Sequence, residues 1–176
     1  MSHISVREFS VDDSVEDLTA LLHLAYAEWI AQAQKFTAID QSAAQTRTRI
    51  ADATVLLAIQ HDEWIGTVTL QQGGPALEAP YFQNPEVAIF TQFGVHPAQK
   101  GKGVGKLLFE EARKWALSKG AQELVCDTSE NATHLLLMYQ AWGMKIVDRI
   151  DWPTTNYQSL ILSLDLTVSP PPQSNL

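Results

Sequence analysis

The chain lacks the cysteines from which disulfides or zinc sites are built. Cys126 is its one cysteine in 176 residues, so an intramolecular disulfide is excluded. No group of cysteines and histidines has the spacing of a zinc site, and we predict no bound metal. Sparse cysteine suits a reducing compartment, and we expect a cytoplasmic protein.

Long apolar runs and an excess of basic charge are also lacking. No stretch reaches the length of a membrane span, and the first residues lack the basic and apolar regions of a secretory signal. Twelve Lys and Arg stand against 20 Asp and Glu, for a formal net charge of −8. We therefore expect neither a membrane nor nucleic acid as a partner.

Against this acidic background, lysines and glycines gather in one stretch. Residues 90–115 read as a buried strand stopped by Pro97, a short loop, and a helix with one apolar face. Loop amides and lysines in front of a helix N-terminus are suited to bind phosphate. A turn that only joins strand to helix would also explain the glycines. The loop residues are Lys100, Gly101, Lys102, Gly103, Val104, Gly105 and Lys106.

Three phosphate-binding loops compete for this spacing. A Walker loop is excluded because Leu107 replaces its hydroxyl residue and Lys100 stands where its first glycine belongs. A dinucleotide fingerprint fails because its third glycine would fall on Lys106 or Leu108. The stretch 100–105 instead resembles the acyl-CoA loop of GNAT acetyltransferases, Gln/Arg-x-x-Gly-x-Gly/Ala.

A second motif downstream strengthens the resemblance. Residues 137–144, Leu-Met-Tyr-Gln-Ala-Trp-Gly-Met, are similar to the GNAT signature Leu-Tyr-Glu-Lys-x-Gly-Phe, with Tyr139 late in a helix. The chain departs from the family pattern in two residues. Lys100 replaces Gln or Arg and cannot make a bidentate fork, and Met144 replaces Phe. No carboxylate is visible in the middle of the fourth strand, around residues 89–92.

The resemblance and the hydrophobic patterns predict an α/β fold. We expect one mixed, mostly antiparallel sheet of about seven strands flanked by helices, within a single domain over 1–166. Residues 167–176, rich in proline, are expected to be a disordered tail. Asp12 and Asp13 are predicted to cap a first helix that follows them. Further helices are expected within 32–52, from 104 to about 119 and over 132–142. Strands are expected at 4–9, 55–60, 64–70, 86–95, 123–127, 145–150 and 159–164.

The resemblance also implies a reaction and its residues. The loop would hold the pyrophosphate of acetyl-CoA, and backbone atoms of Phe93 and Val95 would pair with the pantetheine arm. Tyr139 would be the general acid that protonates the departing thiolate. Asn131, at the opening of the same helix, would also bind the cofactor. A core aromatic remains the alternative for Tyr139, and an N-cap the alternative for Asn131.

The acceptor is less defined. The resemblance implies a primary amine on a small molecule or peptide, and Trp29, Trp152 and Tyr157 could wall its pocket. The general base stays open among His23, His96, His134, Glu28, Glu86 and a water molecule. A non-catalytic acyl-CoA-binding module is the alternative to an enzyme, and a homodimer is left open.

Overall fold

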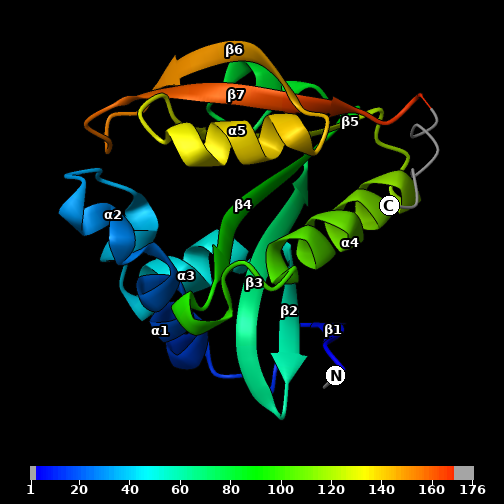
Figure 1. Ribbon diagram of the computed structural model, residues 1–176. Coiled ribbons are helices and arrows are strands. Elements are labelled where there is room, and N and C mark those ends of the chain that lie inside the picture. The colour runs from blue at the N-terminus through cyan, green and yellow to red at the C-terminus, as the bar shows by residue number, and fades with distance from the viewer. Residues whose placement is uncertain (1–2, 169–176) are drawn as a thin grey trace.

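Figure 1 shows one mixed sheet with helices on both faces in the computed structural model, which describes residues 3–168. The strand order is β1-β2-β3-β4-β5-β7-β6, and only β4 and β5 pair in parallel. The strands are β1 (Ser5–Glu8), β2 (Thr54–Gln60), β3 (Glu63–Gln72), β4 (Val87–Val95), β5 (Glu123–Ser129), β6 (Lys145–Asp151) and β7 (Gln158–Asp165).

Within residues 3–168, five α-helices and three 3₁₀ segments surround the sheet. They are α1 (Val15–Tyr26), α2 (Glu28–Ala31), η1 (Thr37–Ile39), α3 (Ala43–Ile50), η2 (Pro80–Gln83), η3 (Pro97–Gln99), α4 (Val104–Ser118) and α5 (Thr133–Ala141). In Figure 1, α1 and α3 lie on one side of β2–β4 and α4 lies on the other. None of the helices within residues 3–168 is long and apolar enough to cross a membrane.

Alternation along the strands divides the core between the two faces. Leu56 and Ala58 of β2 join the cluster beneath α4 and α5, whereas Val55 and Leu57 pack against α1. The same division continues in β4, where Phe90 faces α4 and Ile89 faces away from it. A ligand on one face of the sheet is therefore separated from the other face by the strands.

β4 and β5 separate halfway along their length. Their pairing ends at Ile89 and Val125, and continuing this register would set Thr91 beside Asp127. At that level β4 carries a bulge, because the ladder to β3 shifts register and Gln92 adopts a left-handed backbone with φ +47°. The bulge and the end of the pairing leave a gap between two central strands.

Buried amide hydrogen bonds stabilise the bulge. Gln41 Nε2 donates to Gln92 Oε1 at 2.8 Å, and Gln92 Nε2 donates to Thr69 Oγ1 at 2.9 Å. Gln41 and Gln92 are both buried, so each of these side-chain groups has a partner that replaces water. The left-handed backbone of Gln92 is therefore held by Gln41, which lies just before α3, and by Thr69 of β3.

The predicted fold class and the hairpin of the second and third strands are confirmed. The predicted helix caps were wrong: α1 is capped by Ser14, while Asp13 pairs with Arg7 at 2.6 Å. Hydrogen bonding to Arg7 lowers the pKa of Asp13. The short helix α2 was not predicted, and the predicted loop 76–85 contains η2. Of the predicted tail, residues 169–176 lie outside the described part.

Candidate active site

The glycine loop turns the chain from β4 into α4 by two left-handed residues. Gly101 has φ +75° and Gly103 has φ +85°, a region that residues with a Cβ rarely adopt. Within residues 3–168, no hydrogen-bond acceptor is found for the N–H groups of Val104, Gly105 and Lys106. These amides, at the positive end of the helix dipole, form a cradle suited to an oxyanion.

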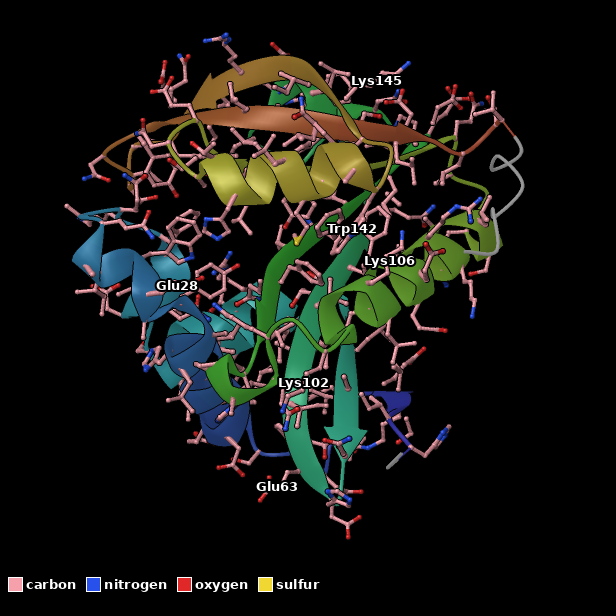
Figure 2. All side chains as sticks on the ribbon, in the orientation of Figure 1. Glu28, Glu63, Lys102, Lys106, Trp142 and Lys145 are labelled. Atoms are coloured by element: carbon pink, nitrogen blue, oxygen red, sulfur yellow. The ribbon has the colours of Figure 1, made fainter. Side chains whose placement is uncertain are left out.

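The three loop lysines differ in what they contact. Lys100 pairs with Glu28 at 2.6 Å, so its charge is directed toward α2. Lys106 pairs with Glu110 at 2.9 Å and lies 5.3 Å from the Trp142 ring centroid; Figure 2 shows the two residues close together. Lys102 has no ion pair within the described part of the chain. It is therefore the loop lysine whose charge is left for a ligand.

A cavity of about 440 Å³ opens beside this loop, and we name it the first cavity. Phe93 and Val95, whose backbone atoms we predict to pair with the pantetheine arm, line it. The Phe93 carbonyl already accepts a hydrogen bond from Tyr26 Oη at 3.0 Å. The lining comes from β4, the loop, α1, α2 and α5, and includes Ala25, Tyr26, Glu28, Trp29, Phe36, Phe93, Val95, Lys100, Gly101, Gly103, Gly105, Lys106, His134, Met138, Tyr139 and Trp142.

Tyr139 lies in the wall of the first cavity and also packs in the core. Its side chain is 4% exposed, and its ring contacts Phe90, Phe93 and Trp142 at centroid distances of 5.7–6.2 Å. Within residues 3–168 its hydroxyl has no hydrogen-bond partner. Burial raises its pKa well above the usual value, so the phenol is neutral and retains its proton at neutral pH.

Two other predicted ligand-binding residues have different places. Asn131 does not line the first cavity, and the N-cap of α5 is Ala132 rather than Asn131. Trp29, predicted to wall an acceptor pocket, lines the first cavity together with the glycine loop. It is 2% exposed and stacks on His134 at 4.8 Å.

A second cavity of about 440 Å³ lies on the opposite face of β4. Tyr26 and Phe36 line both cavities, so the two meet at these side chains. Segments far apart in the sequence build it, from α1 to the loop between β6 and β7. Its lining is Tyr26, Phe36, Thr37, Ala38, Thr48, Arg49, Gln71, Leu77, Glu78, Phe82, Ile89, Thr91, Gln92, Asp127, Trp152, Thr154 and Thr155.

Asp127 places a half-buried carboxylate in the second cavity, beside the gap between β4 and β5. Trp152 Nε1–H donates to its Oδ2 at 2.8 Å. Burial raises the pKa of Asp127 above its ordinary value, and this exceeds the lowering by the Trp152 hydrogen bond. Burial, and to a smaller extent the negative charge of Asp127, raise the pKa of Tyr26 to about 12.

The sequence pointed to Trp152 but not to Asp127. A lone carboxylate ends an apolar run in residues 123–127, on the same strand face as Val125, and this was the available signal. Tyr157 lines neither cavity. Its ring packs against Phe36, which lines both, at a centroid distance of 5.1 Å.

None of the bases considered from the sequence lies in the second cavity. His23 Nε2 is 2.8 Å from the carbonyl oxygen of Gln41, and His96 accepts from its own turn. Glu86 accepts from Gln122, while Glu28 and His134 line the first cavity. The described residues contain no group of three or more His, Cys, Asp or Glu side chains that could hold a metal ion.

Comparison with solved structures finds the same fold in bacterial acetyltransferases. An IAA acetyltransferase from Bacillus cereus ATCC 14579 is 20% identical, with a TM-score of 0.65, over 93% of this chain and 99% of that one. An N-acetyltransferase from Staphylococcus aureus Mu50 is 18% identical, with a TM-score of 0.67, over 94% and 99%. A GNAT acetyltransferase from Elizabethkingia anophelis with acetyl-CoA bound is 19% identical, with a TM-score of 0.64, over 92% and 97%.

The family itself is shown by sequence. A search of the curated proteins found no match. The model of the Acetyltransferase (GNAT) family, however, matches residues 17–144, a span that includes the glycine loop, Asp127 and Tyr139. Since this span is well over half of the chain, the protein belongs to the GNAT acetyltransferase family and is an acyltransferase.

Proposed function

We propose that this protein is an acetyl-CoA-dependent N-acetyltransferase that moves an acetyl group to a primary amine by direct attack in a ternary complex. The observation that carries the proposal is the gap between β4 and β5, with a cavity on each face. The first cavity is bounded by the glycine loop, and the second contains the carboxylate of Asp127. A thioester in the gap would be within reach of both.

The first cavity suits acetyl-CoA. The free amides at the start of α4 would bind the pyrophosphate, and Lys102 would add a positive charge. The pantetheine arm would lie along Phe93 and Val95, between β4 and α5. The Elizabethkingia anophelis relative, which has acetyl-CoA bound, supports this use of the fold.

The chemistry needs one proton acceptor and one proton donor. Asp127 would take a proton from the incoming ammonium, and its raised pKa makes it a better base than an exposed aspartate. The amine nitrogen then forms a bond to the thioester carbon, an N–H group at the β4 bulge stabilises the oxyanion, and the C–S bond breaks. Tyr139 would donate its proton to the departing thiolate. The nitrogen, which still carries one extra proton after the attack, would lose it to water, and the Tyr139 phenolate would regain a proton from water.

Assays with acetyl-CoA test the proposal. Thiol release should depend on an added primary amine, and calorimetry should show acetyl-CoA binding without one. Binding of acetyl-CoA with no thiol release for any amine would favour the non-catalytic acyl-CoA-binding module. The absence of a carboxylate in the middle of β4 is compatible with that alternative. Absence of binding would contradict both functions. A cytoplasmic location, a homodimer and the domain limits 1–166 stay predictions.

A further inference from the structure

We propose that the acceptor carries a carboxylate beside its amine, as an amino acid does, and that Arg49 binds this carboxylate in the second cavity. This inference rests on the proposed function, because it names the substrate class of the same site. Arg49 comes from α3, and Asp127 and Trp152 come from β5 and the loop before β7. The cavity therefore offers opposite charges to the two ends of one small molecule.

The first argument is that Arg49 has no carboxylate within ion-pair distance in the part of the chain that the structure describes. Within residues 3–168 its guanidinium forms no ion pair, and its one hydrogen bond goes to the neutral amide oxygen of Gln41. A charge withdrawn from water without a paired counter-ion is costly. Burial lowers the pKa of Arg49, and the negative charge of Asp127, elsewhere in the second cavity, offsets this only in part. A carboxylate ligand would supply the missing charge.

Three of the other four arginines form ion pairs. Arg7 pairs with Asp13 at 2.6 Å, Arg47 with Glu16 at 3.5 Å, and Arg113 with Glu110 at 3.7 Å. The fourth, Arg149, forms none within residues 3–168, but it is exposed to solvent and donates to Gln158 Oε1 at 3.2 Å. Arg47 is on the same helix as Arg49, two residues away, and faces solvent. Within residues 3–168, Arg49 is therefore the arginine that is partly withdrawn from solvent without an ion pair.

The second argument is that Arg49 is held in position. Gln41 accepts its hydrogen bond and donates to both Thr46 and Gln92, and Gln41 is 1% exposed. Gln92 is the residue at the β4 bulge, so a chain of hydrogen bonds links the guanidinium to the strand that borders the gap. A planar guanidinium fixed in this way matches a carboxylate in a bidentate geometry.

The rest of the lining fits an amino acid with an apolar side chain. Asp127 can receive the ammonium group, and Glu78 adds a second carboxylate at the exposed rim. Leu77, Phe82 and Ile89 provide an apolar wall. The volume of about 440 Å³ is in the range of small-molecule pockets.

The experiment compares amino acids with their decarboxylated amines, which differ in the carboxylate alone. The pairs are L-phenylalanine with phenethylamine, L-methionine with methylthiopropylamine, and L-leucine with isoamylamine. We expect kcat/KM to be at least about 10-fold higher for the amino acid in at least one pair. Amines that equal or exceed their amino acids in every pair would overturn the inference and leave the proposed function intact.

Variants of Arg49 assign the effect to this residue. Arg49→Met should raise KM for the preferred amino acid about 10- to 100-fold, with KM for acetyl-CoA unchanged and the preference over the amine lost. Arg49→Lys keeps the charge and should retain part of the preference. Arg47→Met, on the exposed face of the same helix, is the matched control and should behave as the parent. An unchanged preference in Arg49→Met would contradict the assignment.

A binding measurement decides the matter even if no compound is acetylated. Calorimetry of the CoA-saturated protein with L-phenylalanine, L-methionine and L-leucine should show binding to the parent, and weaker binding to Arg49→Met. Failure of turnover with such binding would count against the proposed function alone. No binding of any of the three to the folded parent would overturn the inference. Should Arg49→Met unfold, Arg49→Lys and the paired substrates provide the same test.

Discussion

The two cavities have the same volume and were built in different ways. The first takes its phosphate cradle from one contiguous stretch, and the cradle consists of backbone amides. The second takes its polar groups from side chains of α3, β3, β4, β5 and two loops. A binding site made of backbone depends on a local motif, whereas a site made of dispersed side chains can change one residue at a time.

The largest effect is expected on the acceptor side, at Asp127. Asp127→Asn keeps the shape and an acceptor for Trp152 Nε1–H, but it removes the proposed base. Turnover at neutral pH should fall about 10²–10⁴-fold, while the Kd of acetyl-CoA stays within about twofold. Steady-state rates and calorimetry measure the two quantities. Asp151→Asn, on the exposed edge strand, is the control, and a parent-like rate in Asp127→Asn would exclude the base.

The raised pKa of Asp127 gives two further expectations for pH. The acid limb of kcat/KM should lie above the ordinary aspartate pKa and disappear in Asp127→Asn. The folded state binds this proton more tightly than the unfolded state, so the stability from this group falls as pH rises from about 3.8 to the folded pKa. Asp127→Asn should then unfold at a Tm no lower than the parent at neutral pH. A lower Tm would mean that the carboxylate stabilises the fold.

A smaller effect is expected at Tyr139, on the opposite face. Tyr139→Phe removes the hydroxyl and keeps the ring contacts with Phe90 and Trp142. Turnover should fall about 100-fold, the lower end for a general acid, because water can partly replace the phenol. Acetyl-CoA affinity should change little. Tyr81→Phe removes a hydroxyl bound to Glu123, away from both cavities, and should leave turnover unchanged; a parent-like Tyr139→Phe would make Tyr139 a packing residue.

A still smaller effect is expected at Trp152, where the Michaelis constants of the two substrates should respond differently. Trp152→Phe deletes the indole N–H that bonds to Asp127 and leaves an aromatic ring on the cavity wall. KM for the acceptor should rise about 10-fold, as expected for a lost hydrogen bond to a charged group, while KM for acetyl-CoA is unaffected. Equal changes in both constants would show that the two cavities are not independent.

The smallest effects are expected in the glycine loop, and they differ between neighbours. Gly103→Ala must adopt φ near +85° and should lower the free energy of unfolding by about 1 kcal/mol, a Tm shift of about 2–4 °C. Acetyl-CoA binding should weaken a few-fold. At Gly105 an added Cβ meets ordinary contacts at 3.6 Å, so Gly105→Ala should keep the free energy of unfolding and the Tm of the parent. A larger loss at Gly105 than at Gly103 would contradict this account of the loop.

The sequence predicted the sheet because its signals are local. Alternating apolar residues marked the strands, and Pro97 and Gly120 marked where elements end. The loop spacing and Tyr139 led to the first cavity for the same reason. Arg49, Glu78 and Asp127 are separated by long stretches of chain, and each is unremarkable among its neighbours. Their meeting depends on packing of α3 and η2 against the far face of the sheet, which no local pattern reports.

The bulge and gap in β4 also have a kinetic consequence. Because the cavities open on opposite faces of the sheet, neither substrate has to pass through the other's site to enter or leave. We therefore expect random-order addition, with intersecting lines in double-reciprocal plots and free CoA competing with acetyl-CoA but not with the amine. On this proposal the sheet separates the two binding sites, and the reaction would take place in the gap between β4 and β5.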